Sequence, residues 1–322
     1  MSAPYEVLTM GRVGVDIYPL QIGVGLEDVE TFGKFLGGSP ANVAVAAARH
    51  GRRAAVITRT GEDSLGRFVR RALREFGVHD RFVAPVPGLA TPVTLCEIFP
   101  PDHFPLYFYG RTPTAPDLTI RPEELDTEAI AAAGIFWVTV TGLCREPSFT
   151  AHLAALRARG RRRHTVLDLD YRPMFWGSRR EARDRIARVL PYVTVVVGNL
   201  DECETAVGER DPERAAAALL DLGVELAVVK QGPGGVLGRT ADESVRVPPF
   251  PVEVVNGTGA GDAFGGALCH GLLAGRPLER VLRFANVAGA LVAARVECSS
   301  AMPTEREVLA ALGEAFEGEG TP

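Results

Sequence analysis

A glycine-rich segment late in the chain, Asn256 to Asp262, carries the clearest chemical signal. It reads Asn-Gly-Thr-Gly-Ala-Gly-Asp and is followed by an apolar run of helical length, 263–273. Small residues allow a tight turn that aims several backbone N–H groups at one point, and the positive end of the helix dipole adds to the attraction for an anion. Asp262 falls in the first helical turn, where a carboxylate is either a favourable N-terminal residue or a catalytic base. The segment therefore predicts an anion site beside a carboxylate.

A second glycine cluster, Gly37 and Gly38 followed by Asn42, precedes a helical run of small residues. The cluster is either a tight turn with a polar helix cap, or a place where a polyhydroxylated ligand approaches the backbone and Asn42 exchanges hydrogen bonds with it. Asp16 lies towards the end of the first expected strand, 13–17. Ligands of open α/β sheets gather beyond the carboxyl ends of strands, so these residues are candidates for binding a sugar.

Polar side chains also follow three later β-branched runs. They are Asp168, Asp170 and Arg172 after the first run, Asn199 and Glu202 after the second, and Lys230 after the third. Because the carboxyl ends of parallel strands meet at one edge of a sheet, we expect these groups to converge on a single crevice. Asn199 and Glu202 stand at i and i+3 at a helix start, where their oxygens would suit a hydrated Mg²⁺.

Motifs and composition disfavour several other classes of function. The chain has no P-loop motif, and no Gly-x-Gly-x-x-Gly follows its first strand, which argues against P-loop and dinucleotide enzymes. A net charge of −5 gives no general attraction to nucleic acid or anionic lipid, and we expect the basic run 157–164 to be a solvated turn. The 5 cysteines show no metal spacing and are expected to be reduced. With no secretory or membrane-length apolar segment, we expect a cytoplasmic protein without a nucleic-acid or membrane partner.

The order of the expected elements indicates the fold. The expected strands are 13–17, 54–58, 134–141, 164–168, 193–198, 226–230 and 235–237. The expected helices between them include 42–50, 65–76, 148–159, 179–190 and 212–222. This alternation predicts one α/β domain, 1–322, with a mostly parallel central sheet covered by helices on both faces. Residues 18–36 and 89–115 break the alternation, and we expect them to form a small antiparallel β lid.

Taken together, the motifs resemble the ribokinase family of carbohydrate kinases, also called the PfkB family, over residues 7–308. The family's Asp-Thr-x-Gly-Ala-Gly-Asp, Gly-Gly-x-x-x-Asn, Asn-x-x-Glu and Asp-x-Asn-x-Arg motifs are similar to 256–262, 37–42, 199–202 and 168–172. This chain departs from them with Asn256-Gly257 in place of Asp-Thr and Asp170 in place of Asn. The resemblance implies a three-layer α/β/α ribokinase-like fold with a small β-sheet lid, and a homodimer formed through the lid.

The resemblance also implies ATP-dependent phosphorylation of a hydroxyl, with ATP and Mg²⁺ as cofactors and K⁺ as an optional third. Asp262 is expected to act as the base, while backbone N–H groups of Gly259, Ala260 and Gly261 stabilise the transferred phosphoryl group. The expected sugar-binding residues are Asp16, Gly37, Gly38, Asn42, Arg111 and Arg172. The expected nucleotide-binding residues are Asn199, Lys230, Gly232, Gly235, Thr258, Gly259, Gly261 and Asn286. Asn199 and Glu202 are expected to hold Mg²⁺ through water.

Within the family, the sequence most resembles members that phosphorylate sugar acids. The features that carry this narrower resemblance are Asn256, the segment 168–176 (Asp-Leu-Asp-Tyr-Arg-Pro-x-x-Trp) and the segment 18–21 (Tyr-Pro-Leu-Gln). The expected substrate is 5-dehydro-2-deoxy-D-gluconate of myo-inositol breakdown, and the alternatives are 2-keto-3-deoxygluconate and the sugars of ribokinases or fructokinases. Both acids carry a carboxylate, for which Arg111 and Arg172 are expected partners. The intact 259–262 segment argues against a catalytically silent sugar sensor.

Overall fold

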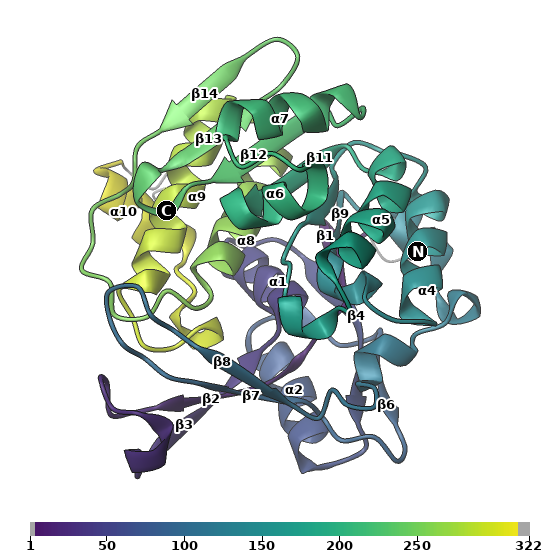
Figure 1. Ribbon diagram of the computed structural model, residues 1–322, viewed down its shortest axis with the longest axis vertical. Helices are drawn as coiled ribbons and strands as arrows, with labels where there is room; N and C mark the ends of the chain where they lie inside the picture. The colour runs from purple at the N-terminus through teal and green to yellow at the C-terminus, as the bar shows by residue number, and fades with distance from the viewer. Residues whose placement is uncertain (1–3, 315–322) are drawn as a thin grey trace, which may run out of the picture.

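The computed structural model describes residues 4–314, and its largest element is a mostly parallel sheet (Figure 1). The strand order is β14-β13-β12-β11-β10-β9-β1-β4-β5, and β6 pairs with β4. The neighbours from β12 to β5 run parallel, whereas β13 and β14 form an antiparallel edge. The strands are β1 (Val7–Met10), β4 (Ala54–Gly61), β5 (Val78–His79), β6 (Val83–Val86), β9 (Ile135–Thr139), β10 (Thr165–Asp168), β11 (Val195–Asn199), β12 (Leu226–Lys230), β13 (Val236–Arg239) and β14 (Ser244–Val247).

Helices cover both faces of this sheet because successive strand residues point to opposite sides. Val7 and Trp137 belong to one hydrophobic core, and their neighbours Leu8 and Phe136 to the other. The first core is completed by α1 (Ser39–Arg49), α2 (Ser64–Glu75), α8 (Ala260–Leu273), α9 (Leu278–Ala293) and α10 (Glu305–Leu312). The second is completed by α3 (Thr127–Ala132), α4 (Ser148–Arg159), α5 (Arg179–Val189), α6 (Leu200–Val207) and α7 (Pro212–Asp221). The predicted three-layer α/β/α architecture is confirmed.

A smaller sheet projects from one end of the body, at the lower left of Figure 1. Its strand order is β3-β2-β7-β8, with bounds β2 (Gly14–Pro19), β3 (Phe32–Gly37), β7 (Val93–Cys96) and β8 (Leu106–Tyr109). The two hairpins are antiparallel, but β2 and β7 pair in parallel, so the sheet is mixed rather than antiparallel throughout. We call it the small sheet.

The first expected strand, 13–17, was assigned to the wrong sheet. The main sheet begins with β1, and residues 14–19 form the central strand β2 of the small sheet. Gly11, with φ of 138°, lies between the two strands and permits the change of direction. Both strands are short and apolar, so composition alone does not distinguish them. The small sheet therefore starts before residue 18, the predicted beginning of the lid.

The small sheet has one face towards the body and one face partly open to solvent. On β8, Tyr107 and Tyr109 are 42% and 58% exposed, while the alternate residue Phe108 lines a cavity. Lys34 on β3 places its ammonium nitrogen 4.2 Å from the ring centroid of Phe68 on α2. A cation over an aromatic face is attracted by the ring quadrupole, so this contact helps to fasten the small sheet to the body.

The basic run 157–164 is only partly the solvated turn that we expected. Arg159 is 1% exposed, and burial lowers its pKa to about 10. Its guanidinium donates to the carbonyl oxygens of Ile130, Ala131, Ala133, Gly134 and Arg163. Arg159 therefore ties the end of α3 to the turn that follows α4. Across residues 4–314, no helix has the length and hydropathy needed to cross a membrane.

Candidate active site

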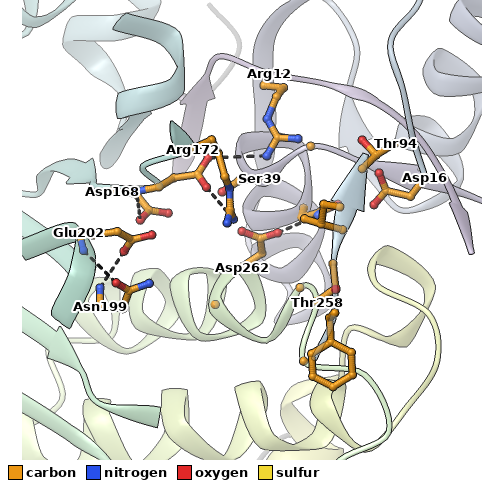
Figure 2. Close-up of a pocket in the computed structure, with 18 of the residues that line it drawn as sticks. Arg12, Asp16, Ser39, Thr94, Asp168, Arg172, Asn199, Glu202, Thr258 and Asp262 are labelled. Atoms are coloured by element: carbon orange, nitrogen blue, oxygen red, sulfur yellow. Dashed lines mark hydrogen bonds and ion pairs between the residues drawn. The ribbon is translucent and has the colours of Figure 1, made fainter. Parts of the chain in front are cut away.

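The polar groups that follow the parallel strands meet in a cavity of about 320 Å³, roofed by β7 and β8 of the small sheet (Figure 2). The cavity lies beyond the carboxyl end of β1, which has β4 on one side and β9 on the other. The chain crosses from β1 to β4 on one side and from β9 to β10 on the other. Such a switch point is where open α/β sheets bind ligands. Four residues predicted from the sequence line it: Asp168 at the end of β10, Arg172 after β10, Glu202 after β11 and Lys230 at the end of β12.

The segment 256–262 forms the predicted tight turn at the start of α8. Gly259 is the N-cap in a left-handed conformation (φ 84°), and a Cβ there would lie 2.2 Å from Sγ of Cys298. Only glycine fits both constraints. Ala260 donates a long 3.4 Å hydrogen bond to Gly257, while the N–H groups of Gly259 and Gly261 have no acceptor within the described residues. Two free donors at a helix N-terminus thus face the cavity, an arrangement suited to an anion.

Asn256, which stands where the similar motif has an aspartate, has a structural role in this turn. Its side chain is fully buried; Oδ1 accepts from the N–H of Thr258 at 3.0 Å, and Nδ2 donates to the carbonyl of Val296 at 2.8 Å. An ionised aspartate has no donor for the Val296 carbonyl. The amide therefore fastens the glycine-rich turn to the segment that follows α9 without a buried charge.

Asp262 projects into the cavity from the first turn of α8. Its Oδ2 accepts a hydrogen bond of 2.8 Å from Nδ2 of Asn42, whose Oδ1 in turn accepts from Ser299 at 2.7 Å. Desolvation in the cavity raises the pKa of Asp262; the Asn42 hydrogen bond opposes this shift, and the nearby Asp170 adds to it. A carboxylate held in one orientation, with a pKa moved towards neutrality, is well suited to accept a proton.

Gly37 and Gly38 are needed mainly because a side chain at either position would collide with a neighbouring residue. A Cβ on Gly37 would lie 2.1 Å from Oδ1 of Asp16, and a Cβ on Gly38 would lie 2.6 Å from the carbonyl oxygen of Arg12. Asp16 can therefore sit deep in the cavity wall, where its Oδ2 accepts from the hydroxyl of Tyr18 at 2.9 Å. Burial raises the pKa of Asp16 to about 6 even though that hydrogen bond and Arg12 both lower it.

Acidic groups gather at the end of the cavity formed by β10, β11 and β12. Burial raises the pKa of Asp168 to about 8; Lys230 opposes this shift, and the negative charges of Asp170 and Glu202 add to it. Burial lowers the pKa of Lys230, but the surrounding carboxylates outweigh this effect and the pKa is raised. Because carboxylates repel each other here, this end of the cavity favours added positive charge.

Asn199 and Glu202 form a capping box at the start of α6. The backbone N–H of Asn199 donates to Oε2 of Glu202 at 2.7 Å, and the N–H of Glu202 donates to Oδ1 of Asn199 at 2.9 Å. Oε1 of Glu202 has no hydrogen-bond partner within residues 4–314. A carboxylate fixed at one oxygen and free at the other fits the predicted role, in which it accepts a hydrogen bond from a water on Mg²⁺.

Several predicted residues lie outside the cavity. Gly232 and Gly235 bound a 3-10 turn after β12, and Asn286 on α9 donates to the carbonyl of Pro248. Their nucleotide contacts stay predictions. Arg111 also lies outside the cavity: it is 8% exposed, and its guanidinium makes a bidentate pair with Asp117 at 3.0 and 3.1 Å in a neighbouring cavity. Its contact with a substrate carboxylate stays a prediction.

Arg12 lines the cavity and was missed from the sequence. Only Gly11 lies between the end of β1 and Arg12, so Arg12 stands at the carboxyl end of a central parallel strand. Recognition of 7–10 as the first strand would have made it a candidate by the same rule that selected Asp168 and Lys230.

Fold and site together are those of a ribokinase-like carbohydrate kinase. The chain belongs to the pfkB carbohydrate kinase family, whose family model matches residues 6–305.

Individual relatives match almost the whole chain. A 5-dehydro-2-deoxygluconokinase of Listeria monocytogenes serotype 4b is 30% identical over 317 residues, covering 97% of each chain. A protein of the same name from Shouchella clausii is 30% identical over 315 residues, covering 96% of each. A crystal structure from E. coli assigned as ribokinase II, in complex with ATP and Mg²⁺, superimposes with a TM-score of 0.86 at 25% identity and covers 96% of this chain and 99% of that one.

Proposed function

We propose that the protein transfers the γ-phosphoryl group of ATP to the primary hydroxyl of 5-dehydro-2-deoxy-D-gluconate, as a cytoplasmic enzyme of myo-inositol breakdown. The observation that carries the proposal is Asp262, held by Asn42 at the N-terminus of α8 beside two free backbone donors. A base and an anion site in contact are what phosphoryl transfer to a hydroxyl requires. The names of the relatives supply the particular sugar acid.

In the proposed reaction, Asp262 accepts the proton of the sugar hydroxyl as its oxygen attacks the γ-phosphorus. The N–H groups of Gly259 and Gly261, with that of Ala260 if its long bond to Gly257 opens, donate to the oxygens of the transferred group. Lys230 lies against this turn, since a Cβ on Gly261 would be 3.2 Å from its ammonium nitrogen. The ammonium offsets negative charge on the phosphates during transfer.

Mg²⁺ would be held at the acidic end of the cavity by water molecules on Glu202 and Asn199, and when bound it neutralises charge on the phosphates. The E. coli structure with ATP and Mg²⁺ supports these two cofactors for a chain of this fold. A role for K⁺ stays a prediction.

At the other end of the cavity, Asp16 and Asn42 orient the sugar hydroxyls, and Phe108 of the small sheet covers them. Closure of the small sheet would exclude water that could otherwise accept the phosphoryl group.

We also propose a homodimer formed through the small sheet. Its support is the exposure of large apolar side chains there: Leu20, Ile22, Phe32, Tyr107 and Tyr109. Sedimentation analysis of Tyr109→Asp against the wild-type chain tests this; equal masses contradict it.

A substrate panel tests the proposed reaction. Purified protein would be given ATP and Mg²⁺ with 5-dehydro-2-deoxy-D-gluconate, 2-keto-3-deoxygluconate, ribose or fructose, and ADP release would be followed. We expect the highest kcat/KM with 5-dehydro-2-deoxy-D-gluconate. Equal efficiency with ribose or fructose would refute the sugar-acid assignment, and absence of ADP release with every sugar would refute a kinase of small sugars.

A further inference from the structure

Arg12 is a buried cation that the proposed transfer of the phosphoryl group does not use. Its side chain is 10% exposed, and it lines the cavity. Its Nε has no hydrogen-bond partner in the described part of the chain. Nε is closed off from the cavity, so the terminal nitrogens, which make no hydrogen bond to Asp170, are the ones that can donate to a group bound there.

Asp170 lies between Arg12 and a second arginine. Its Oδ1 is 2.9 Å from Nη2 of Arg172, and its Oδ2 is 3.7 Å from Nη2 of Arg12. Oδ2 also accepts a hydrogen bond of 3.2 Å from Thr141. One carboxylate therefore faces two guanidinium groups, so neither arginine has Asp170 to itself.

The contact with Asp170 does not satisfy Arg12. At 3.7 Å it is an ion pair without a hydrogen bond, whereas Arg172 has the short contact with the same carboxylate. The guanidinium carbon of Arg12 lies 5.5 Å from the ring centroid of Phe108, which fixes one face of the group against the small sheet. The edge of the guanidinium that carries Nη1 and Nη2 is left to donate into the cavity.

The two arginines lie on the same side of the cavity, as Figure 2 shows, and Asp262 lies on the helix below them. In 5-dehydro-2-deoxy-D-gluconate the carboxylate and the primary hydroxyl are at opposite ends of a six-carbon chain. When the hydroxyl is at Asp262, the carboxylate lies at the far end of the substrate, away from the N-terminus of α8. The guanidinium groups of Arg12 and Arg172 are on that side, and a fork of N–H groups matches the two oxygens of a carboxylate.

We propose that Arg12, oriented by Asp170 and acting beside Arg172, binds the carboxylate of the substrate and so makes the enzyme selective for sugar acids over neutral sugars. The inference rests on the proposed function, because it deepens the assignment of a sugar acid as substrate. It adds Arg12 to Arg172, one of the two arginines that the sequence predicted as partners of the carboxylate.

The test compares Arg12→Met with the wild-type chain on two substrates. One is 5-dehydro-2-deoxy-D-gluconate, and the other is its neutral analogue in which the carboxylate is replaced by a hydroxymethyl group. Since a hydrogen bond to a charged group contributes roughly 1.5–3 kcal/mol, the KM for the acid should rise about 10- to 100-fold. The KM for ATP and the KM for the neutral analogue should change less than about twofold.

Arg145→Met is the matched control, because Arg145 is exposed and lines the neighbouring cavity rather than this one. It should leave the KM for the acid unchanged. Arg12→Lys keeps the charge without the fork and should give an intermediate KM. Thermal unfolding of each variant, and calorimetric titration with ATP, show whether the fold and the nucleotide site persist.

The outcomes separate the inference from the proposed function. An unchanged KM for the acid in Arg12→Met, or an equal rise for the acid and the neutral analogue, overturns the carboxylate contact while the kinase assignment stands. A wild-type chain that phosphorylates ribose or fructose but neither sugar acid overturns the proposed substrate first. A selective rise for the acid alone, absent from Arg145→Met, supports the contact.

Discussion

Asp16→Asn should stabilise the ligand-free protein while weakening its binding of the sugar. Asp16 has an ordinary pKa of 3.8, which burial raises to about 6. Above pH 6 Asp16 is therefore ionised in both states, but its charge is buried in the folded chain and solvated in the unfolded chain. The free energy of unfolding is lowered by this difference. Each pKa unit corresponds to 1.36 kcal/mol, so the difference corresponds to about 3 kcal/mol.

The sign of the pH dependence follows from proton binding. Between pH 3.8 and 6 the folded state binds the Asp16 proton more tightly than the unfolded state, so the stability of the wild-type chain falls as pH rises through this window. The penalty is absent well below pH 3.8 and complete above pH 6. An asparagine keeps an oxygen that accepts from Tyr18 and has no charge to lose.

Urea unfolding at pH 5 and pH 8 measures the effect. We expect Asp16→Asn to raise the free energy of unfolding by up to about 3 kcal/mol at pH 8 and by about half as much at pH 5. The KM for the sugar should rise in the same variant, since the charged acceptor is gone. Asp242→Asn, an exposed position in the turn before β14, should change neither quantity. Equal or lower stability of Asp16→Asn at pH 8 would refute the reasoning.

Three other substitutions test the site and the scaffold. Asp262→Asn should lower kcat by at least about 10²-fold, the contribution of a general base, with ATP affinity unchanged by calorimetry; near wild-type turnover would exclude this role. Glu202→Gln should raise the Mg²⁺ concentration for half-maximal rate, whereas Asp201→Asn, exposed on the same helix, should not, and equal shifts would contradict the metal site. Arg159→Met should cost about 2–3 kcal/mol or more in urea unfolding, because buried carbonyls lose their donor; a loss below about 1 kcal/mol would mean that water replaces it.

The fold was predictable where local chain signals and long-range packing agree. The helix expected at 148–159 has these bounds in the structure, since Gly160 ends it in a left-handed conformation. The helix expected to begin at residue 42 begins at Ser39, because Gly38 rather than a polar side chain is its N-cap. The assignment of 13–17 to the main sheet failed because strand pairing is decided by partners distant in the chain.

In the site, too, residues placed by local chain signals were predictable and residues placed by distant partners were not. Asp262 and Asn199 were predictable because a glycine-rich turn or a strand end places them with little freedom. The arginines were not, because a guanidinium on a long side chain reaches several partners. Arg111 pairs with Asp117, six residues along the chain, in a neighbouring cavity, whereas Arg12 lines the cavity that holds Asp262. Only the folded arrangement shows which of the two lies beside Asp262.

The chain has two lysines, and the structure puts them at two informative places. Lys34 is exposed on the small sheet above Phe68, and Lys230 stands among carboxylates at the end of β12. A reagent that acylates amines would therefore modify the side chains of a 322-residue protein at two positions, which mass spectrometry separates easily. The rate at Lys34 would report on the mobility of the small sheet. Lys230 would react more slowly, because its raised pKa keeps the amine protonated, and a further fall in its rate on adding a ligand would report occupancy of the cavity.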